Sequence, residues 1–414
     1  MMDQYFEDPA ALERAQKSSS GPHLDGYSKW LHDRGFAPSS IQDFMRTAVH
    51  VGLWTERKQI PIRDVDQVVL EQFRAHLRRC SCSGRRKLRR HRKITMWAAR
   101  FVEYLREQNV VREVPQAPAE IHPLAAGFDA WMRQHRGATP ATLQIYGRIV
   151  TSAVGALGDD PSSYDAPGLR SFVLKKSREH GRSKAKQVMT AMRAFLRYLV
   201  ATGACSPGLD GAIPTIAHWR LGALPRYLSP VEIDRVIATC DLSTSSGSRD
   251  HAVLLLLVRL GLRAGDVAAL CLEDIDWHHG TLSVAGKSRR ASRLPLPQEV
   301  GDAILAYLPC RPPTSPRSNR VFLRLAPPWG PITSSAVTCI AAKALRVAGV
   351  VSPSRGAHVL RHTAASELIR KGASLDQVRL VLRHRDPETT RLYAKIDLAL
   401  LRQVAQAWPD VTPC

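Results

Sequence analysis

The sequence predicts a mainly α-helical protein, with two helical domains followed by a mostly helical third domain that contains a small β-sheet. At 414 residues the chain is too long for one ordinary core. Proline-rich segments at 110–123 and 201–227 interrupt the helical periodicity. Strand-like alternation is seen in "TLSVAGKSRRASRLPLP", residues 281–297. We therefore expect domains at 1–115, 118–205 and 228–414, with a linker at 206–227.

The first two predicted domains resemble each other. "WLHDRGFAPSSIQDF" (residues 30–44) is similar to "WMRQHRGATPATLQIY" (residues 131–146). Further on, "RFVEYL" and "AFLRYL" share their aromatic spacing, with Phe101 and Tyr104 in the first and Phe195 and Tyr198 in the second. Both segments also have apolar residues at three- and four-residue steps. A duplicated helical domain explains this pattern, and coincidence of helical patterning is the alternative.

The charge of the chain is strongly positive throughout its length. The formal net charge is +22, made up of +6 for residues 1–120, +8 for 121–230 and +8 for 231–414. A small acidic substrate would need only one basic pocket, whereas a long polyanion contacted by every domain would require this distribution. A proteome rich in arginine is the other explanation.

Basic residues are concentrated at comparable places in the two similar domains. "RRCSCSGRRKLRRHRK" contains nine Lys or Arg between Arg78 and Lys93 and no acidic residue. In the second domain, the basic residues lie along and just before the final predicted helix: Lys175, Lys176, Arg178, Arg182, Lys184, Lys186, Arg193 and Arg197. A run of charge is usually a solvated face, but two such runs in a basic protein favour contacts with phosphates. The candidates, including two residues near the turn of the predicted hairpin, are Arg85, Arg86, Lys87, Arg89, Arg90, Lys184, Lys186, Arg193, Arg289 and Arg290.

Neither the apolar segments nor the cysteines indicate export or a membrane. The run Ala252–Val258 is far shorter than the roughly 20 residues that span a bilayer and predicts a buried helix. The first residues lack the apolar core of a signal peptide, so we expect a cytoplasmic protein without a membrane partner. The eight cysteines are scattered and are expected to be reduced, and Cys80 with Cys82 is only a weak zinc motif.

The third domain begins with a recognisable helix start. In "LSPVEIDRVI", Ser229 can cap the helix, Pro230 suits its first position and Glu232 completes a capping box. Downstream, Arg263 follows the buried helix and Asp266 comes one turn later.

Polar residues that suit phosphodiester chemistry follow in the third domain. Besides Arg263, they are Lys287 near the hairpin turn, His358 and Arg361 in "GAHVLRHTAASELIRKG", and His384 and Tyr393 in "VLRHRDPETTRLYAKI". The sequence shows no carboxylate cluster that could hold magnesium. Guanidinium groups can neutralise the non-bridging oxygens of a phosphodiester while a hydroxyl attacks, so this set suits cleavage without a metal.

At these residues the sequence resembles the tyrosine recombinases, the phage integrase family. The family's Arg, Lys, His-x-x-Arg, His and Tyr fall in order on Arg263, Lys287, His358, Arg361, His384 and Tyr393, and the resemblance covers roughly 121–407. It implies a helical core-binding domain and a catalytic domain that clamp DNA. The region 1–115 lies outside this family plan, and its basic stretch is the reason to expect an extra DNA-binding domain there. Two residues depart from the pattern: Arg383 replaces the usual Gly, and Asp266 replaces the commoner Glu.

The resemblance also implies a mechanism and partners. Tyr393 would attack the scissile phosphate to leave a 3′-phosphotyrosyl link, while Arg263, Arg361 and His384 hold the phosphate oxygens. Lys287 would protonate the departing 5′ oxygen, with His358 assisting as acid or base, and no metal, ATP or other cofactor would be needed. The implied partners are double-stranded DNA with an inverted-repeat core site and a homo-oligomer on that DNA, a tetrameric synapse, with or without other recombinases.

Two other functions and one structural choice stay open. His358 and His362 have a helical zinc spacing, which suggests a metal enzyme, although the glutamate of HExxH is absent. A DNA-binding protein of the same fold that has lost cleavage is the second alternative. Finally, "AKIDLALLRQVAQAW" at 394–408 predicts an amphipathic helix, which the resemblance would dock into a neighbouring protomer rather than onto its own domain.

Overall fold

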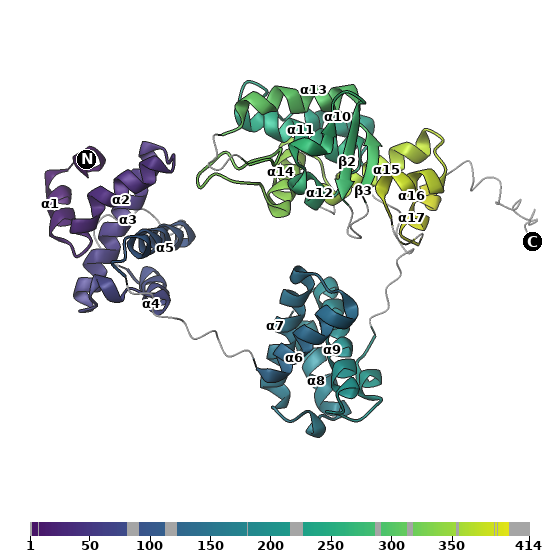
Figure 1. The fold of residues 1–414 in the computed structure, drawn as a ribbon, viewed down its shortest axis with the longest axis horizontal. Helices are drawn as coiled ribbons and strands as arrows, with labels where there is room; N and C mark the ends of the chain where they lie inside the picture. The colour runs from purple at the N-terminus through teal and green to yellow at the C-terminus, as the bar shows by residue number, and fades with distance from the viewer. Residues whose placement is uncertain are drawn as a thin grey trace, which may run out of the picture. The chain divides into compact units, whose positions relative to one another are not determined.

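The computed structural model is mainly helical and contains one small sheet (Figure 1). It describes residues 2–6, 8–80, 91–111, 122–179, 181–215, 227–285, 291–312, 318–352, 356–384, 386 and 388–396. By packing, the chain divides into Met1–Glu113 together with Arg220–Cys414, and Val114–Trp219. Buried apolar residues cluster separately within 5–111, 125–213 and 228–393. The predicted fold class is confirmed, and the domain boundaries stay a prediction.

The N-terminal region is a helical bundle with an aromatic core. Its elements are η1 (Met2–Tyr5), α1 (Pro9–Lys17), α2 (Gly21–Asp33), α3 (Pro38–Arg57), η2 (Ile62–Asp64), α4 (Gln67–Leu77) and α5 (His91–Glu107). Asp66 caps α4, since its carboxylate accepts a 2.8 Å hydrogen bond from the Val69 amide. The cap satisfies one of the amides that a helix start leaves without a partner.

The second helical region has the same plan. Its elements are α6 (Pro123–Arg136), α7 (Pro140–Leu157), η4 (Pro161–Ser163), α8 (Ala166–Arg178), α9 (Arg182–Ala201) and η5 (Leu209–Ala212). Asp165 caps α8 by accepting a 2.8 Å hydrogen bond from the Gly168 amide, as Asp66 caps α4.

One packing arrangement recurs in both helical regions and supports the duplication. In the first, a β-carbon on Gly26 would lie 2.2 Å from the Tyr104 hydroxyl oxygen; in the second, one on Gly127 would lie 2.2 Å from that of Tyr198. The neighbouring indoles are equally placed, with ring centroids 5.9 Å apart for Trp30–Tyr104 and 6.0 Å for Trp131–Tyr198. Because glycine has no side chain, each tyrosine hydroxyl can lie against the backbone of the helix that carries the glycine.

The C-terminal region is built on the buried helix α11 (Ser245–Arg259). Ala252 to Val258 are all buried there, as predicted. The expected capping box starts α10 (Pro230–Ile237): Ser229 and Glu232 satisfy each other's backbone amides. The remaining elements are α12 (Ala264–Ala269), η6 (Leu272–Asp274), α13 (Gln298–Tyr307), η7 (Leu308–Cys310), α14 (Ser334–Val347), α15 (Ala357–Arg370), α16 (Leu375–Leu382), α17 (Glu388–Arg391) and η8 (Leu392–Ile396).

The sheet of this region contains the predicted hairpin. Strands β1 (Ile275–Asp276), β2 (Thr281–Ala285) and β3 (Ala291–Pro295) are antiparallel in the order β1-β2-β3, with Leu282 opposite Leu294. Both leucines are buried, so the register turns one face of the hairpin towards the core. Within the described ranges no helix is long and apolar enough to cross a membrane.

Candidate active site

Helix α15 carries Arg361 into the protein, where only 5% of the residue is exposed. Its guanidinium donates hydrogen bonds to the carbonyl oxygens of Gly261 and Leu382, which joins the turn after α11 to the end of α16. Gly261 has φ +57°, and a β-carbon there would lie 2.7 Å from the Leu382 side chain, so the turn requires glycine. Burial, together with Arg263 and Arg383, lowers the pKa of Arg361 to about 10, and the group stays charged at neutral pH.

Two arginines meet at one carboxylate, and a third lies nearby. Asp266 accepts a 3.1 Å hydrogen bond from the Arg263 amide and a 2.5 Å hydrogen bond from the Arg383 guanidinium. Arg263 in turn donates to the Arg383 carbonyl over 3.1 Å. Burial lowers the pKa of Arg263, Asp266 raises it and Arg383 lowers it again. With Arg361 nearby, three guanidiniums face one carboxylate, and this excess of positive charge favours an anion.

Arg383 occupies the position at which the sequence departs from the family's usual glycine. It has φ +55° and ψ +47°, the left-handed conformation that ends α16. A residue with a β-carbon loses roughly 1–2 kcal/mol in this conformation. Its side chain is only 6% exposed and forms the ion pair with Asp266, which is 11% exposed. The chain therefore keeps the backbone turn before His384 and uses the larger residue as a partner for Asp266.

His384 lies directly after this turn with its ring fixed from one side. Its Nδ1 atom is 2.9 Å from the Thr390 hydroxyl. If that hydroxyl donates to Nδ1, the Nε2 atom carries the proton and can donate to an acceptor. Burial, Arg361 and Arg263 lower the pKa of His384 to about 4, so the ring is neutral at pH 7.

Tyr393, in η8, is buried at 2% exposure, and its hydroxyl has a specific partner. The hydroxyl oxygen lies 2.6 Å from Nδ1 of His362, and Nε2 of His362 lies 3.0 Å from Nε2 of His358. Burial raises the pKa of Tyr393 to about 12, against a lowering effect of Arg361. The nucleophile candidate is thus a protonated phenol that is held by a histidine.

The sequence prediction did not include His362 in this site. Its spacing from His358, one helical turn, was the available signal and suggested a zinc pair instead. Burial, His358 and Arg361 lower the pKa of His362 to about 4, and burial with Arg361 lowers that of His358. Both rings are therefore neutral at pH 7. Among the described residues no third histidine, cysteine or carboxylate joins this pair at ligand distance.

The structure brings five of the six predicted catalytic residues into one region and leaves the sixth undescribed. Arg263, His358, Arg361, His384 and Tyr393 lie around α15 and the end of α16. The predicted residues outside the described ranges are Lys287, Arg289, Arg290, Arg85, Arg86, Lys87, Arg89 and Arg90, together with the terminal helix beyond Ile396.

The described phosphate-contact candidates lie on α9. Lys184 and Lys186 are exposed there. Arg193 is half-buried, and its guanidinium donates to the Ile213 carbonyl over 2.9 Å and to the Thr215 hydroxyl over 2.9 Å. Arg193 therefore holds the segment after η5 in place, and its contact with phosphate stays a prediction.

Comparisons with known proteins agree on one family. Residues 226–399 match the phage integrase family. The chain is 33% identical over 408 residues to y4rA of Sinorhizobium fredii, a protein named as an integrase/recombinase, covering 96% of this chain and 97% of the relative. It is 30% identical over 295 residues to the tyrosine recombinase XerC of Pseudomonas aeruginosa, covering 68% of this chain and 93% of the relative.

Solved structures share the fold. The site-specific recombinase XerH, crystallised with its palindromic difH substrate after cleavage, matches with a TM-score of 0.54 and 16% identity, over 83% of this chain and 96% of that one. A λ integrase dimer bound to a core site matches with a TM-score of 0.53 and 17% identity, over 70% of this chain and 98% of that one.

Proposed function

The chain belongs to the phage integrase family of tyrosine recombinases, and from this premise we propose that Tyr393 is the nucleophile with which it cuts and rejoins DNA. The chain is a site-specific recombinase. The observation that carries the residue assignment is the 2.6 Å contact between the Tyr393 hydroxyl and His362, beside Arg361 and His384.

Deprotonation is the first requirement of the attack. With a pKa of about 12, only about one Tyr393 side chain in 10⁵ is ionised at pH 7. His362 lies at hydrogen-bond distance and is neutral, so its Nδ1 atom accepts the phenolic proton as the oxygen attacks. His358, 3.0 Å from the other ring nitrogen, holds this histidine in the matching tautomer.

The arginines stabilise the charge that develops on the phosphate. A guanidinium has five N–H donors. Arg361 uses one N–H of each terminal nitrogen on a carbonyl, so further N–H groups are left for the non-bridging oxygens. Arg263 and the Nε2–H of His384 complete the contacts with these oxygens.

The bond changes balance without a metal, ATP or other cofactor. The Tyr393 oxygen forms a bond to phosphorus, the bond from phosphorus to the 5′ oxygen breaks, and Lys287 gives that oxygen its proton. The 3′-phosphotyrosyl link keeps the energy of the broken bond. A 5′-hydroxyl of the partner duplex attacks its phosphorus, the bond from phosphorus to the Tyr393 oxygen breaks, and that oxygen takes up a proton as the strands rejoin. Lys287 has this role by the family resemblance.

The DNA is a double-stranded core site with inverted repeats, bound by a homo-oligomer that forms a tetrameric synapse, with or without other recombinases. The net charge of +22, the excess of guanidinium in the site and the exposed Lys184 and Lys186 support a polyanionic partner. XerH and λ integrase were each crystallised bound to their DNA sites.

A nicked suicide substrate tests the assignment. Wild-type protein should form a covalent adduct with a free 5′-hydroxyl, while Tyr393→Phe should bind the same DNA and form none. An adduct in that variant, or a 5′-phosphate linkage, would refute the role of Tyr393. Absence of an adduct in the wild type would favour the alternative, a DNA-binding protein of this fold that has lost cleavage.

A further inference from the structure

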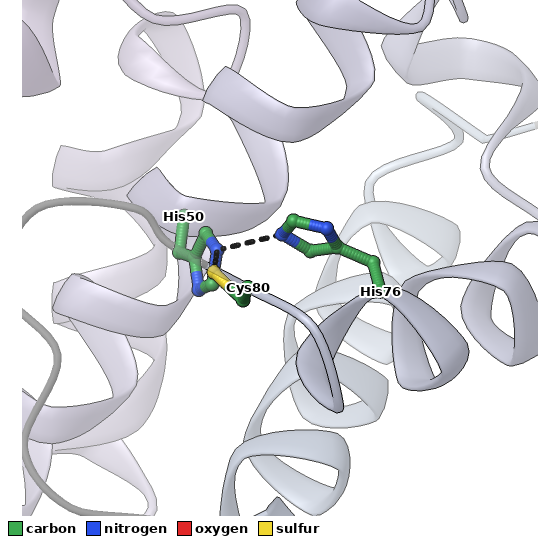
Figure 2. A group of neighbouring side chains, drawn as sticks. All are labelled: His50, His76 and Cys80. Atoms are coloured by element: carbon green, nitrogen blue, oxygen red, sulfur yellow. Dashed lines mark hydrogen bonds between the residues drawn. The ribbon is translucent and has the colours of Figure 1, made fainter.

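Three metal-ligating side chains converge in the N-terminal region, far in sequence from the candidate active site. Nε2 of His50 lies 3.4 Å from Nε2 of His76 and 3.4 Å from Sγ of Cys80, and Figure 2 shows the three groups meeting at one point. All three donor atoms lie within 4.8 Å of one another. We propose that His50, His76 and Cys80 bind one divalent ion of the zinc class.

The distances agree with those of a tetrahedral zinc site. Zinc binds imidazole nitrogen at about 2.0–2.1 Å and thiolate at about 2.3 Å, which places neighbouring donor atoms about 3.3–3.6 Å apart. The two separations of 3.4 Å fall in this range. If the ligand atoms of His76 and Cys80 move slightly closer together, the three side chains occupy three positions of a tetrahedron around the ion. Water or another donor then occupies the fourth position.

Hydrogen bonding alone explains the convergence poorly. Both His76 and Cys80 approach the same ring nitrogen of His50. A neutral imidazole nitrogen either donates one hydrogen or accepts at one lone pair, so it serves two partners badly. A metal ion at the centre would accept a lone pair from all three groups at once.

Two basic residues, Arg57 and Lys58, lie near the cluster. Arg57 and Lys58 repel a cation, and the thiolate of Cys80 offsets part of this repulsion. A soft thiolate ligand selects zinc-like ions over magnesium or calcium.

Aromatic side chains pack around the cluster. The Phe73 and His50 rings meet edge to face, with centroids 5.1 Å apart, and the Trp54 and His76 ring centroids are 5.9 Å apart. Both aromatic residues are almost fully buried, as is Cys80. A hydrophobic shell of this kind stabilises a bound ion by keeping solvent out.

The site joins two helices where the basic stretch begins. His50 is in α3, His76 is in the last turn of α4, and Cys80 follows that helix. The basic stretch between Arg78 and Lys93 starts at this point. Bound metal would fix the end of α4 on α3, so it would stabilise this region independently of the reaction at Tyr393.

Cobalt titration of the reduced full-length chain tests the proposal. We expect one equivalent of Co²⁺ with a thiolate-to-cobalt charge-transfer band, displacement by Zn²⁺, and a rise in Tm on adding zinc. Cys80→Ser, His50→Ala and His76→Ala should each weaken binding by at least about tenfold. Cys80→Ser preserves size, so it decides the result if a histidine variant fails to fold.

Two controls separate this site from the other donors of the chain. Cys205→Ser removes a cysteine of the second helical region, and His358→Ala removes the histidine pair of α15; both should bind cobalt like the wild type. No charge-transfer band in folded wild-type protein would overturn the proposal. Unchanged affinity in Cys80→Ser, or loss of the band in either control, would also overturn it. None of these readouts depends on recombination.

Discussion

Replacing Asp266 by Asn removes the negative charge that faces the arginines of the candidate active site, while the side chain keeps nearly the same size. The amide oxygen of Asn can still accept the 3.1 Å hydrogen bond from the Arg263 amide, so the start of α12 keeps its cap. What is lost is the charge that faces the Arg383 guanidinium at 2.5 Å and the Arg263 guanidinium at 3.9 Å.

The burial of this ion pair sets the size of the effect. The side chains of Arg383 and Asp266 are 6% and 11% exposed. Removing one partner of a buried pair costs about 3–5 kcal/mol, because the other charge is left without compensation. Exposed pairs contribute about 0–1 kcal/mol. We therefore expect Asp266→Asn to lower the free energy of unfolding of the C-terminal region by about 3 kcal/mol or more.

Urea unfolding, with hydrogen exchange read on peptides from α12 and α16, measures this loss region by region. Glu13→Gln is the matched control, because Glu13 pairs with Lys17 at 2.5 Å while the two side chains are 63% and 75% exposed. The control should lose less than about 1 kcal/mol. If Asp266→Asn lost no more unfolding free energy than the Glu13→Gln control, the buried-pair argument would be refuted. Added core-site DNA should restore part of the stability, since a phosphate would face the same arginines.

Four further results are expected. His362→Phe should bind DNA but form the covalent adduct at least about 100-fold more slowly in a single-turnover assay, because a general base contributes about 10²–10⁴-fold; an unchanged rate would contradict its role. Stability of the DNA-free protein should fall as pH drops from about 6.5 towards 4, because His362 and His384 have folded pKa values of about 4, below the unfolded value; a pH-independent urea midpoint would contradict this. Gly127→Ala should destabilise the second helical region by about 1–3 kcal/mol through its clash with a tyrosine hydroxyl, whereas Gly147→Ala, with nothing within 4 Å, should be neutral or stabilising by calorimetry. Neutralising the basic stretch between Arg78 and Lys93 should weaken binding to long DNA and flatten its salt dependence while sparing short core sites; equal loss on both lengths would indicate a role in folding.

Features that depend on local chemistry could be predicted from the sequence. The capping box of Ser229 and Glu232 and the hairpin of β2 and β3 form between residues close in the chain, so composition and spacing predict them. The proposed catalytic set was also predicted from the sequence, through the family resemblance, because motifs such as His-x-x-Arg keep their spacing within one helix.

Which distant groups meet depends on the tertiary structure. Arg383 pairs with Asp266 across 117 positions, and this partner explains why an arginine occupies the left-handed turn. The contact of Tyr393 with His362 spans 31 positions, and that of His50 with Cys80 spans 30. Helical periodicity says which face of a helix is apolar, but which polar side chain lies opposite depends on how the helices cross, and packing of the whole domain sets that geometry.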